Sequence, residues 1–180
     1  MPVSPIVSLR LVAALCLCAL VQVAPVSAAT SSAAEADGVR VTVTRDGSDW
    51  RADYVLDRDA SAWAFYNSSN LNSSRQPWRP RDWAAITPGV VLERVGDLDV
   101  LRMRDGSPMP RRVSLSLTPR GDNLEADYPV LLFTDGSVAM FTGAFDIFPI
   151  ARPDLEALTA DEIADSRHQG ANAHISWRDR

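Results

Sequence analysis

Apolar and polar residues alternate regularly along the chain from residue 38 onward. In residues 39–44 valine alternates with arginine or threonine, and the alternation resumes over residues 50–56 after the Asp-Gly-Ser segment at 46–48. Such alternation on both sides of an Asp-Gly pair is the strongest short-range signal for a β-hairpin. We therefore expect two strands that place Trp50 and Tyr54 on a buried face and their charged neighbours in water.

Short strand patterns recur through the rest of the chain, separated by turn residues. They lie at 62–66, 83–86, 90–94, 98–102, 113–117, 130–133, 138–141, 145–148 and 174–177. The segments at 130–133 and 138–141 are apolar on both faces, so we expect them at the centre of a sheet. The pattern predicts a mainly β fold, an antiparallel β-sandwich of about nine or ten short strands.

One helical segment is predicted near the C-terminus. Pro153, followed by Asp154 and Glu156, is typical of a helix start, because proline fits the first position and acids favour the first turn. The segment 159–162 (Thr-Ala-Asp-Glu) matches a capping box, so the helix can restart there, and Gly170 ends it.

The first 29 residues have the pattern of a secretory signal peptide. Arg10 precedes an apolar run over 11–24, and the small residues at 27–29 fit a small-x-small cleavage site. The alternative is an uncleaved anchor, but the run is shorter than the roughly 20 apolar residues that a span needs. We expect an exported protein, periplasmic or extracellular, with no membrane span after cleavage. Residues 30–37 would form a flexible leader, and 38–180 a single β-sandwich domain.

Charge and cysteine content exclude several classes of function. The net charge is −5, and all 18 basic residues are scattered arginines, whereas phosphate neutralisation needs clustered cations. We therefore expect no nucleic-acid partner. Both cysteines, Cys16 and Cys18, lie in the predicted signal peptide, so a mature chain would contain no disulfide, thiolate nucleophile or cysteine-based zinc site.

The sequence contains no recognisable catalytic motif. His168 and His174 are six residues apart with a glycine between them, and there is no HExxH, Gly-x-Ser-x-Gly or phosphate-binding loop. The Asp-Gly-Ser triplets at 46–48, 105–107 and 135–137 are better interpreted as turns than as calcium ligands. We predict no catalytic residue, no metal site and no cofactor.

Residues 75–83 (RQPWRPRDW) form the least ordinary stretch of the chain. Tryptophan and arginine are over-represented at binding hot spots, so Arg75, Trp78, Arg79 and Arg81 are the candidate surface for a partner or ligand. In the alternative interpretation the tryptophans fold back and cover an open end of the sandwich. We expect that role for Trp83 and leave the docking role open for Trp78.

The chain resembles a group of secreted alphaproteobacterial proteins over roughly residues 38–178. The similarity lies in the alternating strands, the Trp-rich loop at 75–83 and the segments LEADY at 124–128 and FTDGS at 133–137. In those proteins a β-rich N-terminal region precedes a gluzincin-type metallopeptidase domain, related to the aminopeptidase M1 and glycyl aminopeptidase M61 families. Their HExxH motif and downstream glutamate lie in that later domain, so the resemblance carries no catalytic residue over to this chain.

Two functions follow from these observations. The first is an exported, non-catalytic β-sandwich module that docks on a protein partner or on a missing C-terminal domain, as the detached N-terminal part of a metallopeptidase-like protein. The alternative is a free-standing periplasmic module that binds a ligand or associates with the envelope. The sequence indicates no oligomeric state.

Overall fold

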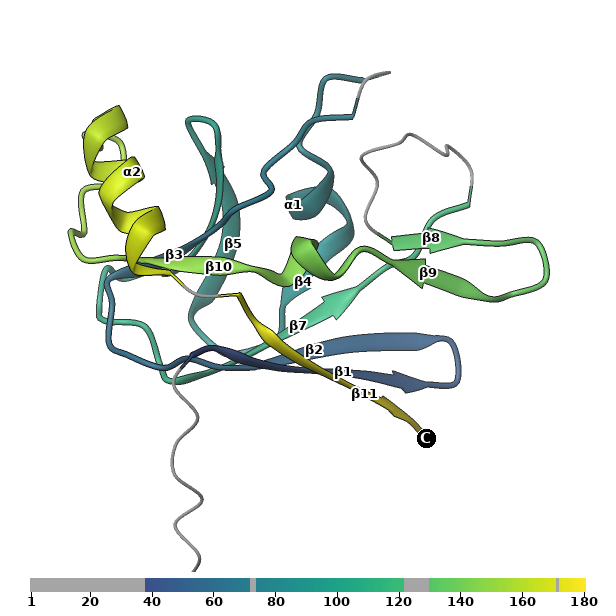
Figure 1. Ribbon diagram of the computed structural model, residues 1–180. Coiled ribbons are helices and arrows are strands. Elements are labelled where there is room, and N and C mark those ends of the chain that lie inside the picture. The colour runs from purple at the N-terminus through teal and green to yellow at the C-terminus, as the bar shows by residue number, and fades with distance from the viewer. Residues whose placement is uncertain (1–37, 72–73, 122–129, 171) are drawn as a thin grey trace, which may run out of the picture. The chain divides into compact units, whose positions relative to one another are not determined.

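Two β-sheets pack face to face around a shared apolar core (Figure 1). The computed structural model describes residues 38–71, 74–121, 130–170 and 172–180, which belong to one compact unit, Ala36–Arg180. The predicted signal peptide and leader lie outside the described residues. The fold is mainly β, and the two-sheet arrangement is the predicted sandwich.

The larger sheet has five strands in the order β11-β1-β2-β7-β4. Their bounds are β11 (His174–Asp179), β1 (Arg40–Asp46), β2 (Asp49–Val55), β7 (Arg112–Leu117) and β4 (Trp83–Ala85). On β2, Tyr54 is buried and Trp50 half-buried against the core, which confirms the predicted phase of this strand.

One edge of this sheet departs from the predicted antiparallel arrangement. β11 runs parallel to β1, with Thr42 opposite Ser176, whereas the other pairings in the sheet are antiparallel. The reason is the route of the chain, which reaches β11 from the far side of the second sheet and enters beside the start of β1, where the His174 amide donates to the Val39 carbonyl.

The smaller sheet has four antiparallel strands in the order β10-β3-β6-β5. They are β10 (Ile147–Ile150), β3 (Ala62–Phe65), β6 (Leu98–Met103) and β5 (Val90–Val95). On β3, Trp63 and Phe65 point into the sandwich core, while Ala62 and Ala64 face an outer layer. This sheet is therefore buried on both faces along β3 and β10.

The outer layer consists of α2 (Ala160–Gln169) and the segment that leads into it. α2 begins at the predicted capping box, with Thr159 as the N-cap. The expectation of a helix from Pro153 is wrong, because residues 153–158 are irregular, with a bend at 153 and a turn at 156–157. This segment directs Leu155 and Leu158 onto the outer face of the smaller sheet, where Leu155 is buried.

The hairpin of β8 (Val130–Leu132) and β9 (Val138–Met140) projects beside the sandwich (Figure 1). We expected these strands at the centre of a sheet, and that prediction is wrong. β8 and β9 pair with each other, and beyond that the described residues add one bridge, from Arg120 to Leu131. Among the described residues neither strand pairs with a strand of the two sandwich sheets, and Phe133 and Phe141 at their ends remain exposed.

Two short helical turns were not expected. α1 (Trp78–Asp82) lies within the Pro-rich stretch, from which the prolines correctly excluded a strand, and the 3-10 helix η1 (Thr142–Phe145) precedes β10. Within the residues that the structure describes, no helix has the length and apolar character needed to cross a membrane.

Candidate functional site

The structure separates the four residues that were predicted to form one docking surface. Trp78 and Arg79 are 2% and 0% exposed, so their assignment to a surface is wrong. Arg75 and Arg81 remain exposed, and Trp83 is buried as predicted. The short helix α1 explains the separation, because its turn directs one side into the core and the other side into water.

Arg79 lies against three aromatic rings in the sandwich core. Its guanidinium carbon is 3.9 Å from the ring centroid of Phe65, 4.3 Å from that of Trp78 and 5.1 Å from that of Trp83. A cation over a desolvated ring face is attracted by the ring's quadrupole. The tryptophans and the arginine of this stretch therefore stabilise each other inside the protein.

The charge of Arg79 is balanced inside the protein by Asp99. Arg79 Nη1 donates to Asp99 Oδ2 at 2.6 Å, and Nη2 donates to the Ala144 carbonyl at 2.9 Å. Arg94 Nε donates to the other carboxylate oxygen of Asp99 at 2.8 Å. Burial lowers the pKa of Arg79 to about 10, against the opposing effect of the Asp99 charge, so Arg79 remains a cation at neutral pH.

A second arginine–aspartate–arginine group lies at the end of α1. The Asp82 carboxylate is fully buried and accepts from Arg81 Nη2 at 2.6 Å and from Arg120 Nε at 2.9 Å. Arg81 therefore belongs to a fold-stabilising ion-pair group. Sequence reasoning missed Asp82 and Asp99, although Asp99 was detectable as a charged residue in the apolar phase of strand 98–103.

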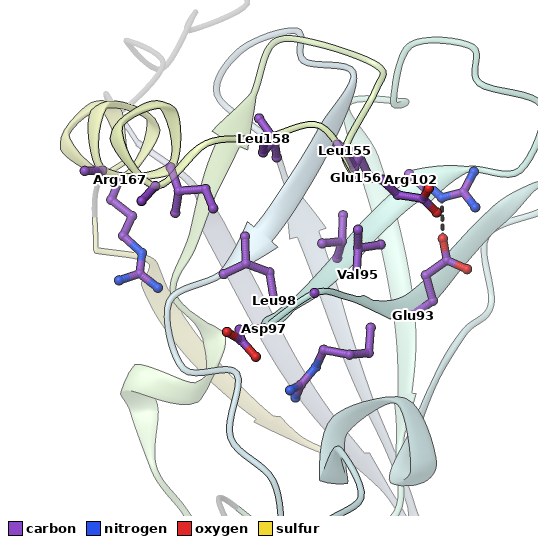
Figure 2. Close-up of a pocket in the computed structure, with 15 residues that line it drawn as sticks. Glu93, Val95, Asp97, Leu98, Arg102, Leu155, Glu156, Leu158 and Arg167 are labelled. Atoms are coloured by element: carbon purple, nitrogen blue, oxygen red, sulfur yellow. Dashed lines mark hydrogen bonds and ion pairs between the residues drawn. The ribbon is translucent and has the colours of Figure 1, made fainter.

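A groove lies on the outer face of the smaller sheet (Figure 2). α2 packs on β10, which leaves the β5–β6 half of that face open beneath the segment 155–167. The resulting groove has a volume of about 800 Å³, within the size range of small-molecule sites. Its apolar lining is formed by the aliphatic side chains of Val95, Leu98, Val100, Leu155, Leu158 and Ile163.

Charged side chains are confined to the rim of the groove. In Figure 2 Glu93, Arg102 and Glu156 lie on one side of the apolar residues, and Arg167 and Asp97 lie on the other. Glu93 and Arg102 form an ion pair with each other. The groove thus combines an aliphatic floor with charged ends, an arrangement suited to binding an amphipathic molecule.

The groove contains no arrangement of groups recognisable as catalytic. It has no histidine, cysteine or serine in its lining, and both histidines of the chain are exposed elsewhere. Among the described residues, no group of three or more His, Cys, Asp or Glu side chains could hold a metal ion.

Comparison with known proteins found no match. The chain matches no protein-family model, no curated protein and no solved structure. The resemblance to metallopeptidase-associated regions therefore stays a prediction, and the function has to be argued from the groove itself.

Proposed function

We propose that this chain is an exported, non-catalytic β-sandwich module that binds a single alkyl or acyl chain in the groove between β5–β6 and α2. The observation that carries the proposal is the lining of the groove, in which the aliphatic side chains of Val95, Leu98, Val100, Leu155, Leu158 and Ile163 lie beside charged side chains. Aliphatic walls without an aromatic ring or a central hydrogen-bonding group suit a flexible hydrocarbon better than a planar or sugar-like ligand.

The attachment of α2 supports this proposal. α2 has no buried residue of its own and is held by its capping box, by the Arg152–Glu162 ion pair and by the Tyr66 hydroxyl, which donates to the Arg167 carbonyl. An element held by so few apolar contacts opens locally at low free-energy cost. The export part of the proposal rests on the signal-like residues 1–29.

An NMR titration with 1-decanol below its aggregation concentration tests the binding. We expect saturable shifts confined to residues of the groove, above all Leu98, Leu155, Leu158 and Ile163. Ala164→Trp should abolish them, because Ala164 lines the groove and is exposed, so the larger side chain fills the hollow without entering the core. Ala157→Trp is the matched control, since Ala157 is exposed but does not line the groove. Shifts that are absent, or unaffected by Ala164→Trp, would refute the proposal.

A second candidate function is protein docking, as the resemblance implies. The observation in its favour is the projecting hairpin, where Leu132, Phe133 and Phe141 are 38%, 45% and 61% exposed. Exposed apolar groups clustered on one element are typical of interaction sites. A photo-crosslinking amino acid at position 141 should give one adduct of defined mass in the producing cell. The same group at position 86 is the control and should give no adduct, because Ile86 is an exposed apolar residue outside the hairpin. Equal labelling at positions 86 and 141 would argue against docking.

A further inference from the structure

We infer that the ligand of the groove is an amphipathic anion, whose alkyl chain lies on the aliphatic floor and whose anionic head group is held by Arg167. This inference rests on the proposed function and adds the chemistry and the orientation of the ligand. It follows from how the arginines of the groove are paired and from where Arg167 is anchored.

Two of the three arginines that line the groove are already engaged by carboxylates. Arg102 pairs with Glu93, and Arg94 Nε contacts the buried carboxylate of Asp99 at 2.8 Å. In the part of the chain that the structure describes, Arg167 has no carboxylate within ion-pair distance. Its guanidinium carbon lies 5.6 Å from the ring centroid of Phe148, so its hydrogen-bond donors remain available for a ligand.

The backbone of Arg167 is held in place by contacts with the sheet. The Arg167 carbonyl accepts a hydrogen bond from the Tyr66 hydroxyl. Directly after α2, Gly170 packs so closely against the chain that an added Cβ would lie 2.8 Å from Phe148 Cβ. These contacts fix the last turn of α2 against the sheet. Arg167 can therefore present its planar fork at the mouth of the groove, a geometry suited to carboxylate and phosphate groups.

The acidic residues of the groove define the direction in which the ligand lies. Glu156 and the Glu93–Arg102 pair occupy the far side, where an anionic head would meet negative charge (Figure 2). Asp97 lies in the exposed turn between β5 and β6, where water weakens its repulsion of an anionic head group without abolishing it. The head group is thus expected at Arg167 and the methyl end of the chain toward Leu155 and Glu156.

Calorimetric titration with four probes of equal chain length tests the inference at pH 7, below their aggregation concentrations. The probes are decanoate, decyl phosphate, 1-decanol and decylammonium. We expect decanoate and decyl phosphate to bind at least about fivefold more tightly than decanol, because a partly exposed ion pair contributes about 1 kcal/mol. The ratio of the two anions distinguishes a fatty-acid-like from a phospholipid-like head group. Decylammonium should bind most weakly.

Two charge-neutralising variants should shift these affinities in opposite directions. Arg167→Gln should reduce the affinity for decanoate to that for decanol, whereas Asp97→Asn should raise it, and both should change the affinity for decanol much less than that for decanoate. Arg178→Gln, an exposed arginine on β11, is the control and should change nothing.

Equal binding of decanoate and decanol, or tighter binding of decylammonium, would overturn the anionic ligand and leave the proposed function standing. Failure of all four probes to bind would instead overturn the proposed function itself.

Discussion

Arg79 occupies a core position that most β-sandwiches give to an apolar side chain. It is buried among aromatic rings and connects α1, the Asn67 carbonyl, η1 and Asp99 on β6. Its Nε has no hydrogen-bond partner among the described residues, so its desolvation is offset by ion pairing and ring contacts. Removing one partner of such a buried ion pair lowers stability far more than replacing both partners with apolar residues.

Removing the Arg79 charge should therefore destabilise the fold strongly. In Arg79→Met, the buried carboxylate of Asp99 keeps only Arg94, and we expect the free energy of unfolding to fall by about 3–5 kcal/mol. Urea denaturation measures this loss. Arg75→Met is the matched control, because Arg75 is exposed, and it should change stability by less than about 0.5 kcal/mol. The double variant Arg79→Met/Asp99→Leu should recover part of the loss. Equal losses of stability in Arg79→Met and Arg75→Met would contradict this role of Arg79.

The sequence indicated which residues were unusual but not where their side chains point. The clustering of tryptophan and arginine at 75–83 was visible, and the burial of Trp83 followed from its place at the start of a strand. The burial of Arg79 depends on Asp99, which is 20 positions away and lies on a strand of the other sheet. No local pattern encodes a contact of that kind.

Among the elements, α2 is stabilised mainly by polar contacts at its start. The Glu162 side chain accepts from the Thr159 amide at 2.8 Å and from the Thr159 hydroxyl at 2.9 Å, and Arg152 donates to its other oxygen at 2.7 Å. These hydrogen bonds lower the pKa of Glu162 from 4.5 to about 2. The bond from the Thr159 amide has the largest effect, followed by the bonds from the Thr159 hydroxyl and the Arg152 side chain. The charged form of Glu162 therefore favours the folded helix.

Acid should loosen α2 before it unfolds the sandwich. Because the pKa of Glu162 is lower in the folded state, its contribution to stability is fully present above pH 4.5 and is lost as the pH falls toward about 2. We expect amide hydrogen exchange in α2 to accelerate over this interval relative to exchange in β1 and β2. Glu162→Gln should remove the pH dependence and leave α2 loosened at pH 7. Exchange that rises equally in all elements would show that the capping box is not responsible.

Local signals explain which elements the sequence predicted well. The capping box at Thr159 and the Asp-Gly-Ser turn before β2 are each complete within a few residues, and the structure has both. The prediction for the β8–β9 hairpin was wrong because two apolar faces indicate burial but do not indicate which strands pair with it. Strands equally apolar in sequence, β3 and β10, are buried because neighbours from distant parts of the chain cover them.

For the whole molecule, the class of fold was predictable and the groove was not. Alternation at period two indicates a sheet with one apolar face, which is enough to predict two sheets packed together. The groove depends on α2 covering only the β10 side of the smaller sheet, and hence on where the segment after Ile150 crosses the outer face. The residues that line the groove are spread from 93 to 167, and no local sequence pattern brings them together.

The proposed export predicts a defined mass for the processed protein. The apolar run at 11–24 and the small residues at 27–29 should direct cleavage near Thr30, and a protein so processed carries neither a lipid nor a disulfide. Intact-mass spectrometry of the exported protein measures this directly, and Ala29→Arg should impair processing by replacing a small residue. A mass that retains residues 1–28, or that includes a diacylglycerol, would contradict the prediction.

The parallel pairing of β1 with β11 has a consequence for the timing of folding. Thr42 and Ser176 lie 134 positions apart, and pairings of such high contact order form slowly because the loop must close before the contact is gained. While the chain emerges in order from its N-terminus, the β1–β2 hairpin is available early, but one edge of β1 waits for residues 174–179. The proposed export in an unfolded state would benefit from that delay, since the first strand cannot complete the sheet before the rest of the chain has passed.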